Sequence, residues 1–232
     1  MLSKTAVIAG STGLIGTRLV ELLVGAPEYA RVIALTRRPD GTASGTLQLR
    51  SADFDHLDTV LGDVRGSAST PLDVFCCLGT TIKTAGSEDA FRRVDFDYVV
   101  STGRWAHHAA ARRFILVSAL GADSASRVFY NRVKGDAEQA VRNLGLASVV
   151  ILRPSLLDGE RKEFRRGERL TLTALRPVRE LLPRSIRPVR DVDVAATMLA
   201  AARMDQAPPV IGSAQMHRAA ARLGTPASGS SA

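Results

Sequence analysis

The sequence has few lysines, cysteines and aromatic residues, and it has no long apolar run. Only four of its 31 basic residues are lysine, and aromatic residues make up 5% of the chain. No stretch reaches the roughly 18 consecutive apolar residues of a membrane-spanning helix, and the N-terminus runs directly into a strand-like segment rather than a cleavable signal. We therefore expect no membrane span and predict a cytoplasmic protein.

The two cysteines, Cys76 and Cys77, are adjacent within an apolar run. Neighbouring residues of a strand point to opposite faces of its sheet, so a disulfide between them would be strained. We predict two buried, reduced thiols. The four histidines have no cysteine partner and no recognisable ligand spacing, and we predict no metal site.

The positive charge is concentrated in one stretch. Arg153–Arg190 holds ten arginines and Lys162 against five acidic residues, which is +6 of the net +8. Nucleic-acid binding is disfavoured because Phe164 is the single aromatic residue there, which leaves no platform for base stacking. Two interpretations stay open for four arginines of this stretch: they line a pocket for an anionic substrate, or they form a solvated surface. These arginines are Arg161, Arg165, Arg166 and Arg169.

Short β-rich runs alternate with stretches of helical periodicity, which is typical of βαβ units and a parallel sheet. The predicted strands are Thr5–Ala9, Arg31–Thr36, Leu47–Leu49, Val74–Leu78, Phe114–Ser118 and Ser148–Leu152. The predicted helices are Leu14–Val24, Ser87–Ala111, Ser126–Leu144 and Asp191–Met204, and Val210–Leu223 adds a short strand and helix. Right-handed crossovers then generate an α/β fold with a Rossmann-like, doubly wound parallel sheet.

Residues 1–152 are predicted to form a dinucleotide-binding Rossmann core. After Arg153 the alternation stops, so we assign residues 153–223 to a small C-terminal substrate-side lobe of the same domain. Residues 224–232 have nothing to pack and are predicted to be a disordered tail.

A glycine-rich turn, Gly10-x-x-Gly13-x-x-Gly16, joins the first strand to the first helix. Such glycines let the main chain approach a pyrophosphate, and the helix N-terminus favours negative charge. The turn therefore predicts a dinucleotide site. Its predicted cofactor-binding residues are Gly10, Ser11, Thr12, Gly13, Leu14, Ile15 and Gly16.

The second strand ends in Thr36-Arg37-Arg38, where an NAD-binding fold usually has an acidic residue for the ribose hydroxyls. A guanidinium suits a 2′-phosphate, which a carboxylate would repel. We predict that Arg37 and Arg38 make the protein prefer NADP(H) over NAD(H). The alternative is an ordinary solvated pair.

Tyr130 and Lys134 lie four residues apart in a predicted helix, which places them on one face. A tyrosine titrates at about 10, so a phenol that works near neutrality needs a pKa about 3 units lower, and a nearby fixed cation supplies such a shift. Ser118 ends a predicted strand, and the carboxyl ends of strands present ligands in this fold. We expect its hydroxyl to bond a substrate carbonyl oxygen.

Together, the glycine turn, Ser118 and Tyr130-x-x-x-Lys134 resemble the short-chain dehydrogenase/reductase superfamily over residues 4 to about 200. Three segments resemble its atypical members grouped with the Tat-interacting oxidoreductase-like proteins: Cys76-Cys77-Leu78-Gly79-Thr80-Thr81, Arg93-Val94-Asp95-x-Asp97-Tyr98-Val99 and Val133-Lys134-Gly135. Two more resemble extended members: Arg153-Pro154 and Val189-x-Asp191-Val192-x-Val194-Ala195.

The resemblance implies that Tyr130 is the general acid/base, that Lys134 binds the nicotinamide ribose and tunes Tyr130, and that Ser118 orients the carbonyl. It also implies that Asp53 and Phe54 border the adenine. The cofactor's ribose and phosphates would lie close to Leu78, Gly79 and Thr80. One position departs from the pattern, because many members have a proton-relaying asparagine where this chain has Asp95.

Our leading hypothesis is an NADP(H)-dependent oxidoreductase that reduces a small-molecule carbonyl. The second is an NADP(H)-binding redox sensor or regulator with little turnover, suggested by Asp95 and the reduced C-terminal lobe. A sugar-nucleotide epimerase ranks lower, because about 80 residues after Arg153 leave little room for a substrate domain. We expect a monomer or a homodimer.

Overall fold

The computed structural model describes residues 3–39, 45–158, 183 and 185–223. The main strands are β1 (Lys4–Ala9), β2 (Tyr29–Thr36), β3 (Leu47–Ser51), β4 (Leu72–Cys76), β5 (Arg113–Val117), β6 (Val149–Arg153) and β9 (Val210–Gly212). The longer helices are α1 (Leu14–Val24), α5 (Tyr98–His108), α6 (Phe129–Arg142), α8 (Asp191–Arg203) and α9 (Ser213–Leu223). Shorter elements are α2 (Leu57–Val60), α3 (Ile82–Ala85), α4 (Glu88–Arg92), the π-helix η1 (Arg93–Asp97), and β7 (Leu157–Asp158) with β8 (Val189–Arg190).

Seven parallel strands form one sheet in the order β3-β2-β1-β4-β5-β6-β9. The strand order reverses between β1 and β4, and this is the point where a doubly wound sheet opens a crevice at its carboxyl edge. The predicted Rossmann-like α/β fold is confirmed. The short strands β7 and β8 pair in a separate parallel sheet.

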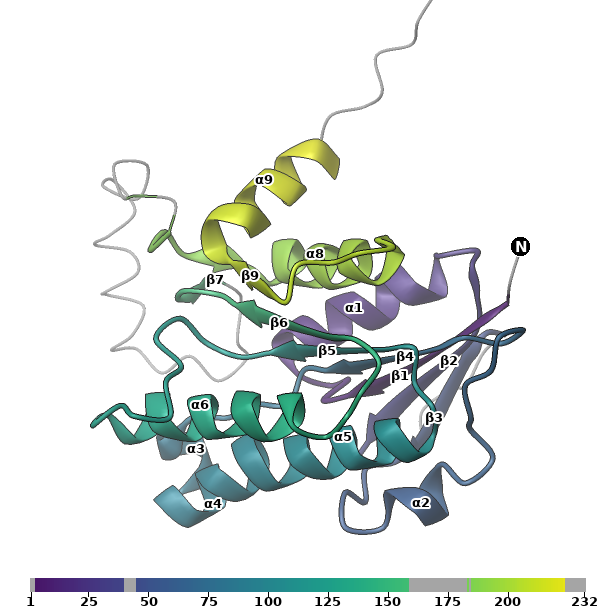
Figure 1. The fold of residues 1–232 in the computed structure, drawn as a ribbon, viewed down its shortest axis with the longest axis horizontal. Helices are drawn as coiled ribbons and strands as arrows, with labels where there is room; N and C mark the ends of the chain where they lie inside the picture. Colours follow the sequence, from purple (N-terminus) through teal and green to yellow (C-terminus); the bar gives the residue numbers. More distant parts are fainter. Residues whose placement is uncertain (1–2, 40–44, 159–182, 184, 224–232) are drawn as a thin grey trace, which may run out of the picture.

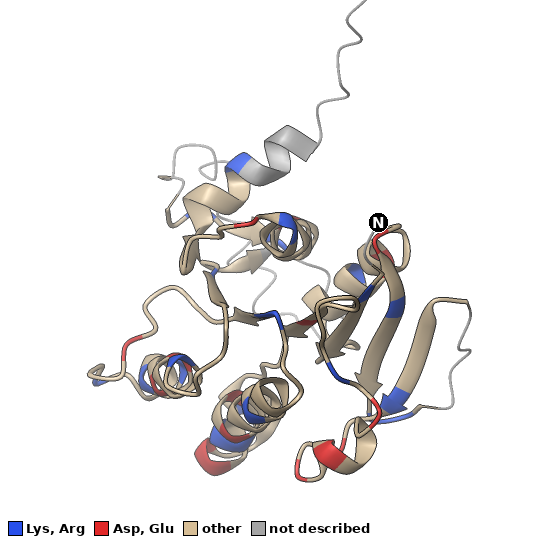
Figure 2. Cartoon of the chain, turned by 45° about the vertical axis from the view of Figure 1, so that its right-hand side comes forward, with Lys and Arg blue, Asp and Glu red and all other residues tan. Residues whose placement is uncertain are grey.

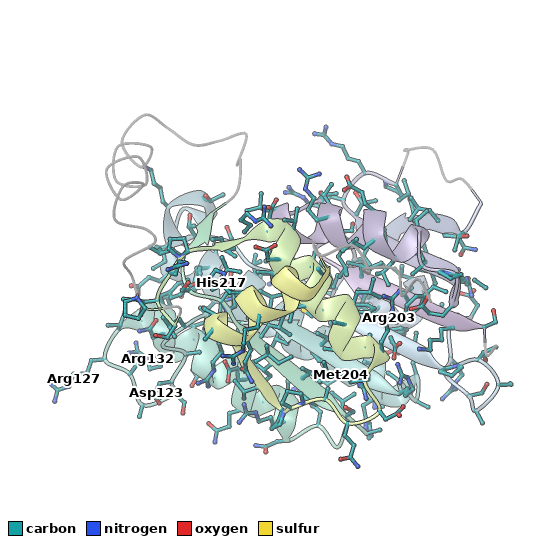
Figure 3. All side chains as sticks on the ribbon, turned by 90° about the horizontal axis from the view of Figure 1, so that it is seen from above. Asp123, Arg127, Arg132, Arg203, Met204 and His217 are labelled. Carbon is teal, nitrogen blue, oxygen red and sulfur yellow. The ribbon has the colours of Figure 1, made fainter. Side chains whose placement is uncertain are left out.

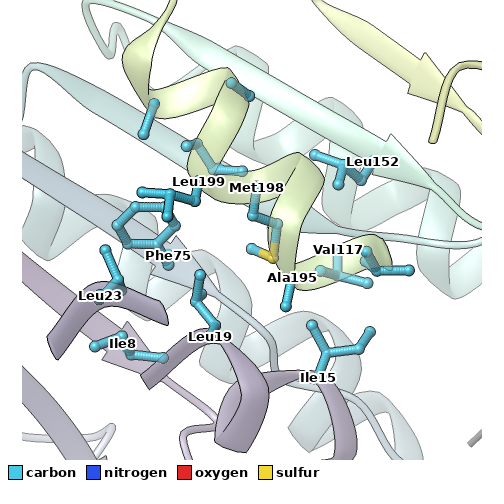
Figure 4. Close-up of a cluster of buried hydrophobic side chains, with 14 of the residues drawn as sticks. Ile8, Ile15, Leu19, Leu23, Phe75, Val117, Leu152, Ala195, Met198 and Leu199 are labelled. Atoms are coloured by element: carbon cyan, nitrogen blue, oxygen red, sulfur yellow. The ribbon is translucent and has the colours of Figure 1, made fainter. Parts of the chain in front are cut away.

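Helices cover both faces of the sheet (Figure 1). Along β1 the side chains alternate: Ala6 and Ile8 pack under α1 and α8, whereas Val7 and Ala9 face the layer that contains α5 and α6. The first layer is filled by Leu19 and Leu23 from α1, with Phe75 from the sheet and residues of α8 (Figure 4). Burial on both faces explains why the central strands are largely apolar, whereas the edge strand β3 is half-buried and includes polar residues.

Helix α1 has the predicted bounds, and the predicted strand and helix in Val210–Leu223 are present as β9 and α9. The prediction of one helix over Ser87–Ala111 was wrong in detail. The chain forms α4, η1 and α5 in succession, with a five-residue π-helix between two α-helices. Wider π turns shift the helical register, and periodicity over a long window does not reveal them.

A buried polar network closes the amino edge of the sheet. The carboxylate of Asp73, which is fully buried, accepts hydrogen bonds from the Tyr29 hydroxyl at 2.7 Å and from the Arg112 guanidinium at 2.7 Å. Arg112 also donates to the Ala202 carbonyl at 2.8 Å, and Arg113 donates to the Met204 carbonyl at 2.6 Å. The two guanidiniums therefore satisfy carbonyls at the C-terminal end of α8, where helical carbonyls have no intrahelical partners.

The charged residues are interspersed over the described elements, with Lys and Arg positions beside Asp and Glu positions (Figure 2). In the basic stretch, Arg153 pairs with Glu138 at 2.6 Å and Arg190 pairs with Asp193 at 2.7 Å. The four arginines proposed to line an anionic pocket lie outside the described residues, as does the predicted tail. They are Arg161, Arg165, Arg166 and Arg169.

Candidate functional site

The glycine turn lies at the carboxyl end of β1 and packs directly on the end of β4. Gly10 has φ +79°, and a Cβ there would lie 2.7 Å from the carbonyl oxygen of Cys77. The turn closes through a hydrogen bond from the Gly13 amide to the Gly10 carbonyl at 3.1 Å. A Cβ on Gly16 would stand 2.1 Å from that same oxygen, so neither position accommodates a side chain in this conformation.

Gly13 is the N-cap of α1 and has no side chain with which to cap the helix. The first turn of α1 also contains no acidic residue. Thr12 and Gly13 are exposed. The amides of an uncapped helix N-terminus, together with the positive end of the helix dipole, form a site suited to an anion such as a pyrophosphate.

The other residues of the turn have different surroundings. The Ser11 hydroxyl donates to the Leu35 carbonyl at 2.6 Å, which ties the turn to β2. Ile15 packs into the core between α1 and the sheet (Figure 4), and Leu14 is half-buried. The side chains of Ser11 and Ile15 are therefore engaged within the fold, and these residues can contact a ligand only through main-chain atoms.

The two arginines after β2 are exposed at the same edge of the sheet. The main chain turns at this point, because the Arg38 amide donates to the hydroxyl of the buried Thr36 at 3.2 Å. Neither guanidinium of Arg37 or Arg38 forms an ion pair with another described side chain. Both are accessible to a ligand that lies over the end of β2.

Asp53 and Phe54 follow β3. The Asp53 carboxylate accepts hydrogen bonds from the amides of Asp55 and His56, both at 3.2 Å, and so forms a local turn. The Phe54 ring is buried and stacks on Tyr98, with the ring centroids 4.9 Å apart. These contacts fix the wall that the sequence resemblance assigns to the adenine.

The carboxyl end of β4 continues into Leu78, Gly79 and Thr80. Leu78 is buried, and the Thr80 amide donates to Asp95 at 2.9 Å. A Cβ on Gly79 would lie 3.6 Å from the Asp95 carboxylate and 3.6 Å from the Lys134 ammonium. This segment thus joins the glycine turn on one side to the Asp95–Lys134 pair on the other.

Ser118 lies one residue beyond β5, at the edge of the sheet where it was expected. Its side chain is buried, with 6% of the residue exposed, and its hydroxyl has no hydrogen-bond partner within the described part of the chain. An unsatisfied buried hydroxyl is costly. Because this hydroxyl lies at the carboxyl edge of the sheet, where this fold binds ligands, a bound ligand would supply its hydrogen-bond partner.

Tyr130 lies in the first turn of α6 and is half-buried, with its ring 5.4 Å from that of Phe91. Lys134, one turn later, is buried, and its ammonium lies 2.7 Å from the Asp95 carboxylate. Burial by itself lowers the pKa of Lys134, but the attraction of Asp95 and Tyr130 outweighs it, and the net pKa is raised. Lys134 is therefore a cation at any physiological pH.

The loop between β5 and α6 packs tightly on the helix that carries these residues. A Cβ on Gly135 would lie 2.2 Å from the Asp123 carbonyl carbon, so only glycine allows this contact. Asp123, Arg127 and Arg132 lie together at one end of the molecule, away from Arg203 and Met204 (Figure 3). The loop therefore belongs to the carboxyl edge of the sheet.

A family model described as NAD(P)H-binding matches residues 10–205. The chain is 34% identical over 169 residues to the mitochondrial protein FMP52 of Coccidioides immitis, which covers 69% of each chain. It is also 34% identical over 172 residues to protein HTATIP2 of Rattus norvegicus, covering 72% of this chain and 69% of the relative. The chain belongs to the NAD(P)H-binding family.

Solved structures of the extended dehydrogenase and epimerase class have the same fold as this NAD(P)H-binding protein. The UDP-N-acetylglucosamine 4-epimerase of Bacillus cereus superposes with a TM-score of 0.65 at 17% identity, covering 90% of this chain and 79% of the other. At that identity the likeness concerns the fold alone. The chain is thus an atypical, short-chain-dehydrogenase-like NAD(P)-binding protein, and the resemblance drawn from its motifs is confirmed.

None of the helices in the described ranges is long and apolar enough to cross a membrane. Cytoplasmic localisation stays a prediction, since the FMP52 relatives are named as mitochondrial proteins.

Sequence reasoning missed two features of this candidate site and misplaced the start of one helix. Asp95 departs from the family pattern, but its direct pairing with Lys134 was not expected. The need for glycine at position 135 was also missed, although the sequence Lys134-Gly135 places a helix-disfavoured residue in mid-helix, and that is a usable signal. The helix predicted to begin at Ser126 begins instead at Phe129, with Val128 as its N-cap, and the Ser126 hydroxyl accepts a hydrogen bond from the Val128 amide at 3.1 Å.

Proposed function

We propose that this protein is an NADP(H)-dependent carbonyl reductase. The observation that carries the proposal is the buried Ser118 hydroxyl at the carboxyl edge of the sheet, which has no partner among the described residues. It is followed along the chain by the Tyr130–Lys134 face of α6. A hydroxyl without a partner among the described residues, a phenol and a buried ammonium are the groups that a carbonyl oxygen needs as it gains negative charge.

The described residues fit a dinucleotide. The uncapped N-terminus of α1 would receive the pyrophosphate, because Gly10, Gly13 and Gly16 bring the main chain close and no side chain blocks it. Arg37 and Arg38 would bind a 2′-phosphate, which favours NADP(H) over NAD(H). Asp53 and Phe54 would border the adenine, and Leu78, Gly79 and Thr80 would line the ribose and phosphates.

The side chains then have separate roles. The Ser118 hydroxyl donates to the substrate carbonyl oxygen and orients it, and Tyr130 transfers its phenolic proton to that oxygen as it becomes an alcohol. Lys134 favours the phenolate that Tyr130 leaves behind. A bound NADPH supplies the hydride that the carbonyl carbon accepts.

The surroundings of β5 and β6 favour an apolar substrate body. Leu120 and Leu156 are both exposed just beyond these strands, and the Leu120 amide bonds to the Pro154 carbonyl at 2.8 Å, which holds the two segments together. Val128 at the start of α6 and Ile186 before β8 are exposed as well. Large apolar side chains exposed at a ligand edge favour an aromatic or aliphatic ketone or aldehyde over a keto acid.

The test is NADPH oxidation over a panel of aldehydes, ketones and keto acids. Tyr130→Phe should lower kcat by about 100-fold or more, because general acid catalysis typically contributes that much. NADPH binding, followed by nucleotide fluorescence, should survive in that variant. Ser118→Ala should also lose activity, whereas Ser124→Ala, a change at an exposed serine of the neighbouring loop, serves as its control. Unchanged turnover in Tyr130→Phe would exclude this mechanism.

Cofactor preference is tested separately by calorimetry. Arg37→Gln and Arg38→Gln should weaken NADPH binding about tenfold each and leave NADH binding nearly unchanged, because a charge-assisted bond to the 2′-phosphate is lost. Arg104→Gln removes an exposed arginine from α5 and is the matched control. Equal affinity of the unaltered protein for NADPH and NADH would exclude the preference.

The second candidate function is an NADP(H)-binding sensor with little turnover. It is favoured by the ion pair of Lys134 with Asp95, because a lysine engaged by a carboxylate has less charge to offer a phenolate. Tight NADPH binding without oxidation of NADPH by any carbonyl, together with a protein partner that binds one redox state of the complex, would support it.

A further inference from the structure

The Asp95–Lys134 pair is buried where the proposed chemistry takes place. The side chain of Lys134 is 7% exposed and that of Asp95 is 0% exposed, with 2.7 Å between the ammonium and the carboxylate. Each charge alone would be expensive at this burial, and an isolated buried lysine responds by losing its proton. The two groups are therefore charged because they face each other.

The carboxylate is held by the main chain and by a special helical turn. Its second oxygen accepts a hydrogen bond from the Thr80 amide at 2.9 Å. Asp95 is the sole buried residue of η1, whose neighbouring positions are exposed or half-buried. A π turn directs one side chain out of the α-helical register, and such turns recur at functional sites. The carboxylate thus has a fixed place rather than a choice of rotamers in solvent.

We infer that Asp95 is a positioning residue for this site: its carboxylate keeps the Lys134 ammonium charged and in one place beside Gly79. The role of the Asp95–Lys134 pair in a reductase rests on the proposed function, whereas the pairing itself does not. An asparagine would keep the hydrogen bond from Thr80 but would leave the buried ammonium without a counter-charge.

Within the described ranges, three titratable groups act on the Lys134 ammonium: Asp95 from η1, Tyr130 from the same helix, and Cys76 from β4. Burial raises the pKa of the Cys76 thiol to about 12, so this thiol is neutral near pH 8. Asp95 therefore supplies the negative charge that offsets the burial of Lys134. Its loss should move the Lys134 titration, and the loss of a carboxylate elsewhere on η1 should not.

The experiment uses the full chain with lysine labelled by 13C at Cε, followed by NMR from pH 7 to pH 12. Four lysines give four signals, and Lys134→Arg identifies the signal of Lys134. In the unaltered protein Lys134 should titrate above the ordinary lysine value of about 10.5. In Asp95→Asn it should titrate below that value, whereas Asp97→Asn, which removes an exposed carboxylate two residues away, should leave the Lys134 titration unchanged.

A Lys134 signal that titrates at the same pH in Asp95→Asn as in the unaltered protein would overturn the inference. If that variant does not fold, the unaltered protein still decides, because a Lys134 signal that titrates below the ordinary lysine value of about 10.5 would contradict the charge-keeping role. Once a carbonyl substrate has been identified, kcat can be measured as a function of pH. In Asp95→Asn the alkaline limb of this profile should move to lower pH, and KM for NADPH should rise. A Lys134 titration that moves to lower pH in Asp95→Asn, without any reductase activity of the unaltered protein, would support the pairing and reject the proposed function.

Discussion

The α-carbon of Gly16 lies so close to Gly10 that a β-carbon on Gly16 would stand 2.1 Å from the Gly10 carbonyl oxygen. The main chain of the turn and the first turn of α1 are thus in contact, and this contact shapes the uncapped helix N-terminus. Gly16→Ala should destabilise the fold by about 1–3 kcal/mol, as overpacking does, and should remove NADPH binding.

Gly25→Ala is the control for this prediction, because Gly25 has φ −81° and a Cβ there meets the Glu21 carbonyl oxygen at an ordinary 3.6 Å. Urea unfolding and NADPH fluorescence measure the two effects. Normal NADPH affinity in folded Gly16→Ala would show that the turn tolerates the displacement and that the phosphate site lies elsewhere.

Asp73 is predicted to matter for stability alone. Its carboxylate is buried among Tyr29, Arg112 and the C-terminal end of α8, at the edge of the sheet opposite the candidate site. Asp73→Ala should lower the free energy of unfolding by about 3–5 kcal/mol, because it leaves the partly buried Arg112 without its counter-charge. The folded fraction should bind NADPH normally, and a loss of stability below about 1 kcal/mol would contradict the network's role.

The sequence was sufficient for most of the sheet because strands that are buried on both faces consist of continuous apolar residues, and the glycine turn marked the first residue of α1. It was insufficient for Asp95. The pairing with Lys134 joins residues 39 positions apart, and it depends on a π turn that has no periodic signature. The four-residue helices α2 and α3 and the two-residue strands β7 and β8 were missed for a similar reason, since so few residues show no period.

The two thiols should be inert in the folded protein. Burial raises the pKa of Cys76 to about 12 and raises the pKa of Cys77 as well, and the reactive species is the thiolate. At pH 8, Ellman's reagent should react with neither thiol within minutes in native protein and with both in urea. Cys76→Ser and Cys77→Ser identify which residue reacts; rapid modification of Cys76 in the native state would mean that the end of β4 opens readily.

The pH dependence of stability should separate Asp95→Asn from the unaltered protein. In the latter the pKa of Lys134 is raised in the folded state, so its contribution is complete below the unfolded value of about 10.5 and is lost only as the pH rises through the higher folded value. Between pH 7 and pH 10 Lys134 therefore adds nothing to the pH dependence of the free energy of unfolding.

In Asp95→Asn, burial should lower the pKa of Lys134 in the folded state. The unfolded state then binds more protons, and the free energy of unfolding should rise with pH over this range. Urea titrations at several pH values, with Asp97→Asn as the reference for an exposed carboxylate, measure the difference in slope. Parallel curves for the two variants would mean that Lys134 reaches water or another anion when Asp95 is replaced.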